Sequence, residues 1–273
     1  MDYSHVLETC TRAAREAGQL ALASLGNPGF QQWKGPRDLL AGSVLPIQQR
    51  IIDVIHSDFP EHVILAEESA ESETNAPPIE SDPLWIVDPI DGSLNFYHGV
   101  PHFAISIAYR EEDIYRVGVV YDPRTDEMFQ AVQGRFARLN GQPINVQQIF
   151  EGESAYDAAI VGTDLPGGMK ERQQSLNIAT LLAMQCITLN VMGSPALGLC
   201  YVAAGRYHAY YHTDLKLWDV AAASVILGES GGIFTNIRGG SWRHAAGGYI
   251  ASNGVIHGWM VRNAQAVLDR VRS

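Results

Sequence analysis

The sequence predicts a mixed α/β protein, with an α+β first half followed by an α/β second half. Two helical patterns and then a run of apolar strands open the chain, an order typical of an antiparallel meander packed on helices. Further on, strands and helices alternate, which favours strands buried between helix layers. The chain has 273 residues, 46% of them apolar and 18% charged, so it can bury a large core and is not expected to be disordered.

The expected elements of the first half follow from hydrophobic spacing. Residues 3–25 carry apolar side chains at helical intervals, and Pro46 suits the first turn of a second helix that ends before Pro60. Residues 30–43, which include Lys34, are expected to form a loop between these helices. Asn140 followed by Gly141 predicts a hairpin turn. Strands are expected at residues 62–65, 85–87, 103–110, 115–121, 127–133 and 136–139, and an exposed loop at 71–83.

Alternating elements are expected in the second half. The boundary between the halves is predicted at residues 151–156. The chain is therefore expected to form a single unit, residues 1–273, in which 1–150 make the α+β half and 151–273 the α/β half. Strands are expected at residues 158–162, 187–192, 207–211, 233–235 and 248–251, and helices at 169–183, 193–204, 217–229 and 255–271.

Charge and cysteine content narrow the classes of partner. The net charge is −11 and no basic run stands out, which argues against nucleic acid as a main partner. Cys10, Cys186 and Cys200 are odd in number and widely spaced, which fits reduced thiols of a cytoplasmic protein better than a disulfide framework. Neither a signal peptide nor an apolar stretch of about 18 residues is evident, so no membrane association is expected.

Residues 85–96, Trp-Ile-Val-Asp-Pro-Ile-Asp-Gly-Ser-Leu-Asn-Phe, are the most informative stretch of the chain. The first three favour a strand entering the core, and Pro89 is expected to end its ladder because proline has no N–H to donate. The side chains of Asp88 and Asp91 and the carbonyl of Ile90 can then converge at the strand end. Hard oxygen atoms of this kind are the ligands that divalent cations such as Mg²⁺ prefer.

A helix start directly follows these carboxylates. Gly92 and Ser93 form a predicted turn into a first helical turn, where N–H groups without helical partners stabilise an anion such as phosphate. Two acidic residues in a loop are usually only a solvated turn, but two further segments point to a site. An apolar run ends in Glu67 and Glu68, and an apolar helix carries Asp219 in its first turn.

Together the three segments resemble the inositol monophosphatase family of metal-dependent phosphatases. That family shows a Glu-Glu pair, then Trp-Ile-Val-Asp-Pro-Ile-Asp-Gly-Thr-x-Asn-Phe, then Trp-Asp-x-Ala-Ala, and this chain carries them in the same order at 67–68, 85–96 and 218–222. The resemblance covers nearly the whole chain. It implies a sugar-phosphatase-like αβαβα five-layer sandwich, a metal site at the seam of the halves, and a homodimer.

The resemblance also implies which residues bind metal. Glu67, Asp88 and the Ile90 carbonyl would bind a first cation, and Asp88, Asp91 and Asp219 a second, with Asp88 bridging. Two or three Mg²⁺ ions per site are implied, with Mn²⁺ as an alternative. Two cations about 4 Å apart would activate a water and stabilise the leaving oxygen, so hydrolysis of a phosphate monoester is the expected reaction.

Phosphate binding and water activation are assigned in the same way. The backbone amides of Gly92 and Ser93 would hold the phosphate, and the Ser93 hydroxyl, where the family usually has threonine, would orient the attacking water. Glu67, Asp88 and Ser93 are thus the candidate catalytic residues. Glu68 is expected to support the site without binding metal.

One segment departs from the family pattern. Where the family carries an aspartate that pairs with the threonine to activate water, this chain has Val44; Ala41 replaces a threonine, and Gln48 stands in place of a glutamate. A valine cannot accept a proton. Either Glu67 and the metal alone activate water, or turnover is weakened.

Substrate contacts are expected from the second half. Gly193 and Ser194, followed by Pro-Ala, match a substrate-facing Gly-Thr-Ala turn of the family. His212 falls where inositol phosphatases often carry a glutamate, and it is either a ligand for a substrate hydroxyl or an exposed loop histidine. Asp164 is either a further substrate contact or part of a turn that leads into a helix.

Three functions remain open from the sequence. The first is Mg²⁺-dependent hydrolysis of small monoesters, such as inositol or a related polyol or sugar monophosphate. The second is a 3′(2′),5′-bisphosphate nucleotidase, which would need an adenine platform that the sequence does not reveal. The third is a weakly active or regulatory member that uses the fold as a surface, an alternative motivated by Val44.

Overall fold

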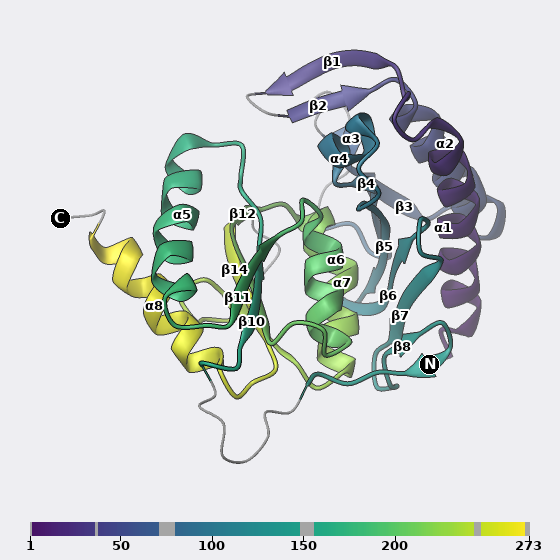
Figure 1. Ribbon diagram of the computed structural model, residues 1–273. Helices are drawn as coiled ribbons and strands as arrows, with labels where there is room; N and C mark the ends of the chain where they lie inside the picture. The colour runs from purple at the N-terminus through teal and green to yellow at the C-terminus, as the bar shows by residue number, and fades with distance from the viewer. Residues whose placement is uncertain (1, 36–37, 71–79, 148–155, 243–246, 271–273) are drawn as a thin grey trace.

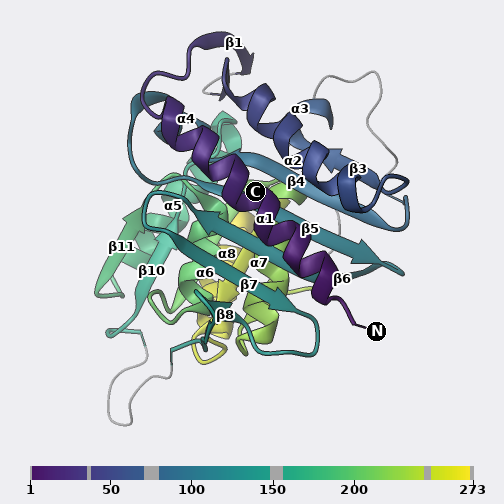
Figure 2. The same cartoon turned by 90° about the vertical axis from the view of Figure 1, so that its right-hand side faces the viewer.

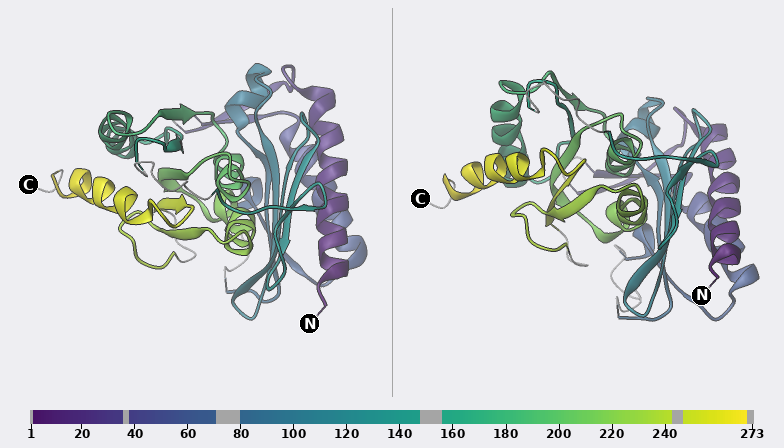
Figure 3. Two further views of the ribbon diagram at one scale, coloured as in Figure 1. Left: turned by 60° about the horizontal axis from the view of Figure 1, so that its bottom comes forward. Right: turned by 90° about the horizontal axis from the view of Figure 1, so that it is seen from below.

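The computed structural model describes residues 2–35, 38–70, 80–147, 156–242 and 247–270. They form five layers, which run from right to left in Figure 1: α1 and α2, a seven-stranded sheet, α6 and α7, a five-stranded sheet, and α5 and α8. The predicted αβαβα sandwich is therefore confirmed. Figure 3 shows the same order of layers from two other directions.

The outer helices of the first half are α1, Ser4–Ser24, and α2, Val44–Asp58, both close to their predicted bounds. They cover the face of the seven-stranded sheet that Figure 2 turns toward the viewer. Small buried side chains on α1, including Cys10, Ala14 and Ala17, allow it to pack closely on the strands beneath.

The seven-stranded sheet has the order β3-β4-β5-β6-β7-β8-β9. Only the first pair, β3 and β4, is parallel, and the remaining pairs are antiparallel, as the predicted meander requires. Every residue of β4 is buried, because helices cover both faces of the sheet. The strands are β3 Val63–Ala66, β4 Leu84–Asp91, β5 Ala104–Glu111, β6 Ile114–Asp122, β7 Glu127–Val132, β8 Arg138–Leu139 and β9 Gln142–Pro143.

The prediction that Pro89 ends the central strand is wrong. Asp88 pairs with Ser106 and Asp91 with Ala104, so β4 contains one extra residue relative to β5 and continues beyond the proline. Pro89 lies inside this bulge, where its missing N–H costs no ladder bond. In a regular strand, residues three apart point to opposite faces; the extra residue returns Asp88 and Asp91 to the same face.

The predicted loop at residues 30–43 is also wrong. This segment contains a two-stranded antiparallel hairpin, β1 Phe30–Gly35 and β2 Asp38–Ala41, which arches over the top of Figure 1. Phe30 and Trp33 are 54% and 62% exposed. Leu40 and Ala41 of β2 are buried, whereas β1 exposes its large apolar side chains, so the segment lacks the regular apolar–polar alternation that would have predicted strands.

The five-stranded sheet has the order β11-β10-β12-β14-β13, with β10, β11 and β12 parallel and the other pairs antiparallel. Its strands are β10 Ile160–Thr163, β11 Thr188–Val191, β12 Ala209–Leu215, β13 Ile233–Asn236 and β14 Gly247–Ser252. The second-half helices are α5 Met169–Ala183, α6 Pro195–Ala203, α7 Leu217–Glu229 and α8 His257–Arg270, and the short α3 Glu67–Ala70 and α4 Ser93–His98 lie in the first half.

The middle layer joins the two sheets. Nearly all of α6 and most of α7 is buried, as expected for helices that are apolar on every side. On β6, a Cβ added to Gly118 would lie 2.2 Å from the Ala222 carbonyl oxygen, so glycine is required where strand and α7 approach. The division at residues 151–156 stays a prediction, because residues 151–155 lie outside the described ranges.

Two further predictions concern cysteines and membranes. Cys10, Cys186 and Cys200 are free thiols, so the expectation of no disulfide framework is confirmed. Across the described ranges, none of the helices has both the length and the apolar character needed to cross a membrane.

Candidate metal centre and active site

Three carboxylates converge where β4 ends beside the first turn of α7. Asp88, Asp91 and Asp219 each offer an oxygen, and these atoms all lie within 4.8 Å of one another. Asp88 and Asp91 are 2% and 3% exposed, and Asp219 is half-buried. We call these three residues the aspartate cluster. The structure thus brings together side chains that are 131 positions apart in the sequence (Asp88 to Asp219).

Backbone donors fix the orientation of each aspartate. The Ile90 N–H donates to Asp88 Oδ1 at 3.0 Å, and the Lys216 N–H donates to Asp219 Oδ2 at 2.7 Å. Asp91 Oδ2 accepts the Ala196 N–H at 3.0 Å, at the start of α6. One oxygen of each carboxylate is therefore held by the fold, which pre-orients the cluster for a ligand.

Burial disfavours the ionised forms of the three aspartates. Burial first, and then the neighbouring charges of Glu67, Asp91 and Asp219, raise the pKa of Asp88 well above its usual range. Burial likewise raises the pKa of Asp91 to about 7 and raises that of Asp219. Divalent cations would reverse this penalty because they favour the ionised carboxylates. The donor set, made of oxygens without cysteine or histidine, fits a hard cation such as Mg²⁺.

A different charge arrangement lies next to the cluster. Lys34 of β1 places its Nζ 2.8 Å from Glu67 Oε1 and 3.3 Å from Glu68 Oε1, and its side chain is only 7% exposed. We call Lys34, Glu67 and Glu68 the lysine–glutamate corner. No role for Lys34 is predicted from the sequence, because only the folded hairpin brings this lysine to the glutamates.

Val44 and Gln48, which stand where the family carries acidic residues, are both buried next to this corner. Val44, the first residue of α2, is 1% exposed and packs in the same apolar cluster as Ala41 and Ile90. Gln48 is 5% exposed; its Oε1 accepts the Glu68 N–H at 3.1 Å. Gln48 therefore orients the Glu68 backbone.

The predicted phosphate cradle has the geometry of a sharp turn. Gly92 adopts φ +98°, a left-handed conformation that glycine tolerates, and a Cβ there would lie 2.8 Å from the Gly193 carbonyl oxygen. Ser93 opens α4, and its hydroxyl donates to the Ile90 carbonyl at 3.1 Å. That oxygen has a second lone pair, so it can also bind a cation.

One cavity of about 560 Å³ connects these groups to the second half. Glu67 and the whole aspartate cluster line it, with Ile90, Gly92 and Ser93. Its lining also includes Gly193, His212, Lys216 and residues 164–168. A volume of this order suits a small-molecule ligand.

The predicted substrate contacts His212 and Ser194 are both buried, but only His212 lines the cavity. His212 lies on β12 at 5% exposure, so its alternative as an exposed loop histidine is wrong. Its Nδ1 accepts the Asp214 N–H at 3.1 Å, and burial lowers its pKa to about 3, which keeps the ring neutral near pH 7. Ser194 departs from its expected role: it is fully buried and its hydroxyl donates to Asp91.

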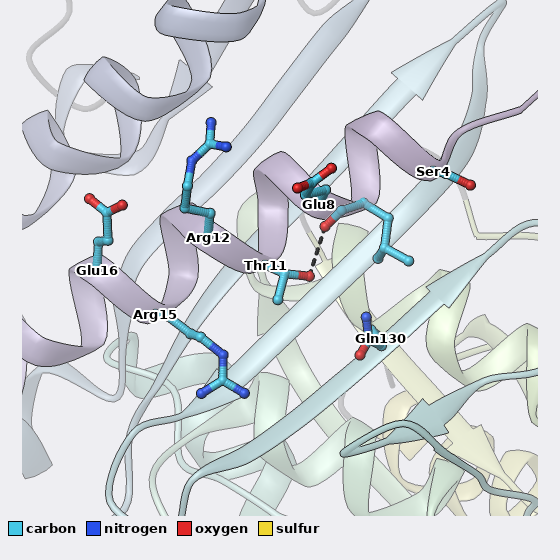
Figure 4. A pocket seen from close by; sticks show the side chains of 8 residues that line it. Ser4, Glu8, Thr11, Arg12, Arg15, Glu16 and Gln130 are labelled. Carbon is cyan, nitrogen blue, oxygen red and sulfur yellow. Dashed lines mark hydrogen bonds between the residues drawn. The ribbon is translucent and has the colours of Figure 1, made fainter.

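A second cavity, of about 540 Å³, lies on the outer face of α1, on the other side of the seven-stranded sheet from α7 (Figure 4). Its two arginines are paired: Arg12 Nη2 is 2.6 Å from Asp58 Oδ2, and Arg15 Nη1 is 3.0 Å from Asp126 Oδ1. It contains no carboxylate cluster comparable to that of the β4 site among the residues that line it.

Comparison with known proteins places this fold and site in a class. The chain belongs to the inositol monophosphatase family, whose model matches residues 2–269. It is similar to the Thermotoga maritima IMPase, with a TM-score of 0.87 and 29% identity over 98% of this chain and 99% of that one. It is equally similar to the extragenic suppressor protein SuhB of Bartonella henselae, with a TM-score of 0.87, 28% identity, and 96% and 99% of the two chains covered.

Sequence relatives carry a different kind of name. The chain is 36% identical to the Nus factor SuhB of Vibrio cholerae over 270 residues, 98% of this chain and 96% of that protein. It is 35% identical to the Nus factor SuhB of Escherichia coli K12, with 91% of each chain covered. The name of these relatives does not describe a phosphatase. They therefore do not support the prediction that the protein has no nucleic-acid partner.

Proposed function

We propose that this protein hydrolyses small phosphate monoesters of polyols or sugars, inositol monophosphate among them, with the help of Mg²⁺. The observation that carries the proposal is the aspartate cluster, three oxygens within 4.8 Å of one another, in the same cavity as Glu67. Family membership supports phosphatase activity. Mn²⁺, with the same preference for oxygen ligands, is expected to substitute.

The residues are assigned as follows. Glu67, Asp88 and the Ile90 carbonyl would hold one cation, and Asp88, Asp91 and Asp219 would hold the other. When bound, the cations neutralise charge on the phosphoryl oxygens and make a water molecule more acidic.

The other groups act on substrate and water. The amides of Gly92 and Ser93 hold the phosphate, the Ser93 hydroxyl orients the water, and Glu67 accepts its proton. His212, neutral and at the cavity wall, donates from Nε2 to a substrate hydroxyl.

The test is phosphate release from inositol 1-phosphate, glycerol 2-phosphate, AMP and adenosine 3′,5′-bisphosphate, each with Mg²⁺ and with chelator. Activity is expected on the polyol esters and only with the cation. Equal activity after chelation would contradict the metal-dependent mechanism. Preference for the bisphosphate would replace the proposed substrate class with the nucleotidase alternative.

A regulatory function is the second candidate, supported by the name that the Vibrio and Escherichia relatives share. In that case the fold serves as a surface and turnover is weak, as the neutral Val44 also suggests. The discriminating result is the absence of turnover on every ester while Mn²⁺ still binds. Binding of RNA at physiological salt, measured by fluorescence anisotropy, would then decide whether nucleic acid is the partner.

We further propose a homodimer. Strand β11 is an edge of the five-stranded sheet, and apolar side chains near it are exposed: Met184 at 85%, Ile187 at 67% and Val191 at 53%. An exposed apolar edge of this kind is normally covered. Light scattering should give twice the 29.9 kDa of the chain, and Ile187→Lys should shift it toward the monomer.

A further inference from the structure

The turn between β11 and α6, Met192–Gly193–Ser194, is held from both halves of the molecule. Gly193 has φ +84°, and a Cβ there would lie 2.7 Å from Asn95 Nδ2. A side chain at this position would therefore be both strained and obstructed. The turn borders the active-site cavity through Gly193.

Asp164, at the end of β10, binds the amide side of this turn. Its Oδ1 accepts the Met192 N–H at 2.9 Å and the Gly193 N–H at 2.5 Å. Its Oδ2 accepts the Tyr210 hydroxyl at 2.9 Å, and Asp164 as a whole is 5% exposed. Both carboxylate oxygens are thus engaged by donors of the protein.

The Tyr210 hydroxyl is fixed in place by its surroundings. Tyr210 is 2% exposed, and its ring lies against two glycines: a Cβ on Gly198 would be 2.3 Å from the ring, and one on Gly162 would be 2.9 Å from it. The ring can occupy this space only because both neighbours lack side chains. The packing of the ring therefore fixes the Tyr210 hydroxyl in the position from which it donates to Asp164.

Asn95 binds the carbonyl side of the same turn. Its Nδ2 donates to the Met192 carbonyl at 2.8 Å and lies 3.3 Å from that of Gly193, while it also donates to the His102 carbonyl at 2.7 Å. Asn95 belongs to α4, in the first half. The turn is thus clamped between a carboxylate of one half and an amide of the other.

This clamp leads directly to the aspartate cluster. The hydroxyl of Ser194, the last residue of the turn, donates to Asp91 Oδ2, and the same oxygen accepts the Ala196 N–H at 3.0 Å. Displacing the turn would therefore displace the two donors that hold Asp91. The chain of contacts runs from Asp164 through the turn to Ser194 and ends on Asp91.

We propose that Asp164 is a positioning residue that sets the orientation of Asp91 through the Met192–Ser194 turn, and not a substrate contact. This inference rests on the proposed role of Asp91 as a cation ligand. A carboxylate suits the task because it accepts from all three donors at once. Asparagine keeps the acceptor for the two amides but loses the charge, and alanine loses every contact.

The test uses the full chain and Mn²⁺ alone, with calorimetric titration as the readout and no substrate present. Asp164→Ala is expected to weaken Mn²⁺ affinity about 10-fold, and Asp164→Asn and Tyr210→Phe less, in the same direction. Asp53→Asn, an exposed aspartate on α2, is the matched control and should leave affinity unchanged. Where the alanine variant fails to fold, the other two variants carry the test.

Steady-state kinetics separate positioning from substrate contact. A positioning role predicts that kcat falls at limiting Mn²⁺ and recovers at high Mn²⁺, with KM nearly unchanged. Unchanged Mn²⁺ affinity together with a raised KM would overturn the inference in favour of a substrate contact. If the unsubstituted protein binds no Mn²⁺, the inference fails with the proposed metal site; if it binds Mn²⁺ without turnover, only the proposed activity fails.

Discussion

The aspartate cluster and the lysine–glutamate corner meet at one cavity, which the corner reaches through Glu67, but they stabilise buried charge in different ways. Asp88, Asp91 and Asp219 have raised pKa values because burial, and then neighbouring carboxylates, disfavour their ionised forms. Glu67 and Glu68 instead have the ammonium group of Lys34 within 3.3 Å. The difference teaches that the aspartate cluster depends on external cations, whereas at the corner Lys34 already balances part of the negative charge of Glu67 and Glu68.

The largest effect is expected from removing one carboxylate of the aspartate cluster. Asp91→Asn should lower kcat by about 100-fold or more, because it removes a proposed ligand of the second cation. Without metal the variant should melt no lower than the wild type, since one repelling charge is gone. Enzyme assays and thermal melts with chelator measure both, with Asp53→Asn as the control; near-normal turnover would show that the site is elsewhere.

Removing the internal cation should mainly affect stability. Lys34→Met removes the ammonium group beside the buried Glu68 and the half-buried Glu67, a change expected to cost about 3 kcal/mol in the free energy of unfolding. Urea denaturation in chelator measures this loss, and Mn²⁺ should restore part of it. Lys170→Met, at an exposed position on α5, is the control. An unchanged midpoint in chelator would mean that the glutamates take up protons when Lys34 is lost.

Restoring the missing aspartate is expected to fail as a gain of function. Val44 packs in the apolar core, and it is not among the residues that line the cavity. Val44→Asp should therefore cost about 2 kcal/mol or more through burial of a charge, without raising kcat. Val44→Ala separates lost packing from added charge. A stable Val44→Asp variant with increased kcat would instead place this position at the site of water activation.

The smallest expected effect is a pH dependence confined to the metal-free protein. The folded state holds a proton on Asp91 up to a pKa of about 7, whereas the unfolded state releases it near 3.8. Between these values the folded state binds more protons, so its stability falls as pH rises. The melting temperature in chelator should decrease from pH 5 to pH 8, and the gain from added Mn²⁺ should increase. Asp91→Asn should reduce both trends without abolishing them, because Asp88 and Asp219 also have raised pKa values.

The helices and the ordered core strands could be predicted from the sequence because their signals are local. Hydrophobic spacing predicted α1 and α2 nearly to the residue, and the apolar run of β4 predicted the central strand. The residues within each acidic motif, through their resemblance to the inositol monophosphatase family, likewise identified Asp88, Asp91 and Asp219 as candidates before any geometry was known. Each of these signals depends on neighbours within a few turns or residues of the chain.

The tertiary structure alone decided how those candidates are held. Leu40 and Ala41 of β2 pack in the core, but Phe30 and Trp33 of β1 are exposed, so nothing in the local pattern predicted that Lys34 would reach Glu67. The bulge at Pro89, which turns Asp88 and Asp91 to one face, depends on pairing with β5. Ser194 was expected to face a substrate, but α6 packs where its hydroxyl meets Asp91. Contacts between segments about 100 residues apart are set by how whole layers pack, and that packing is not encoded in any local pattern.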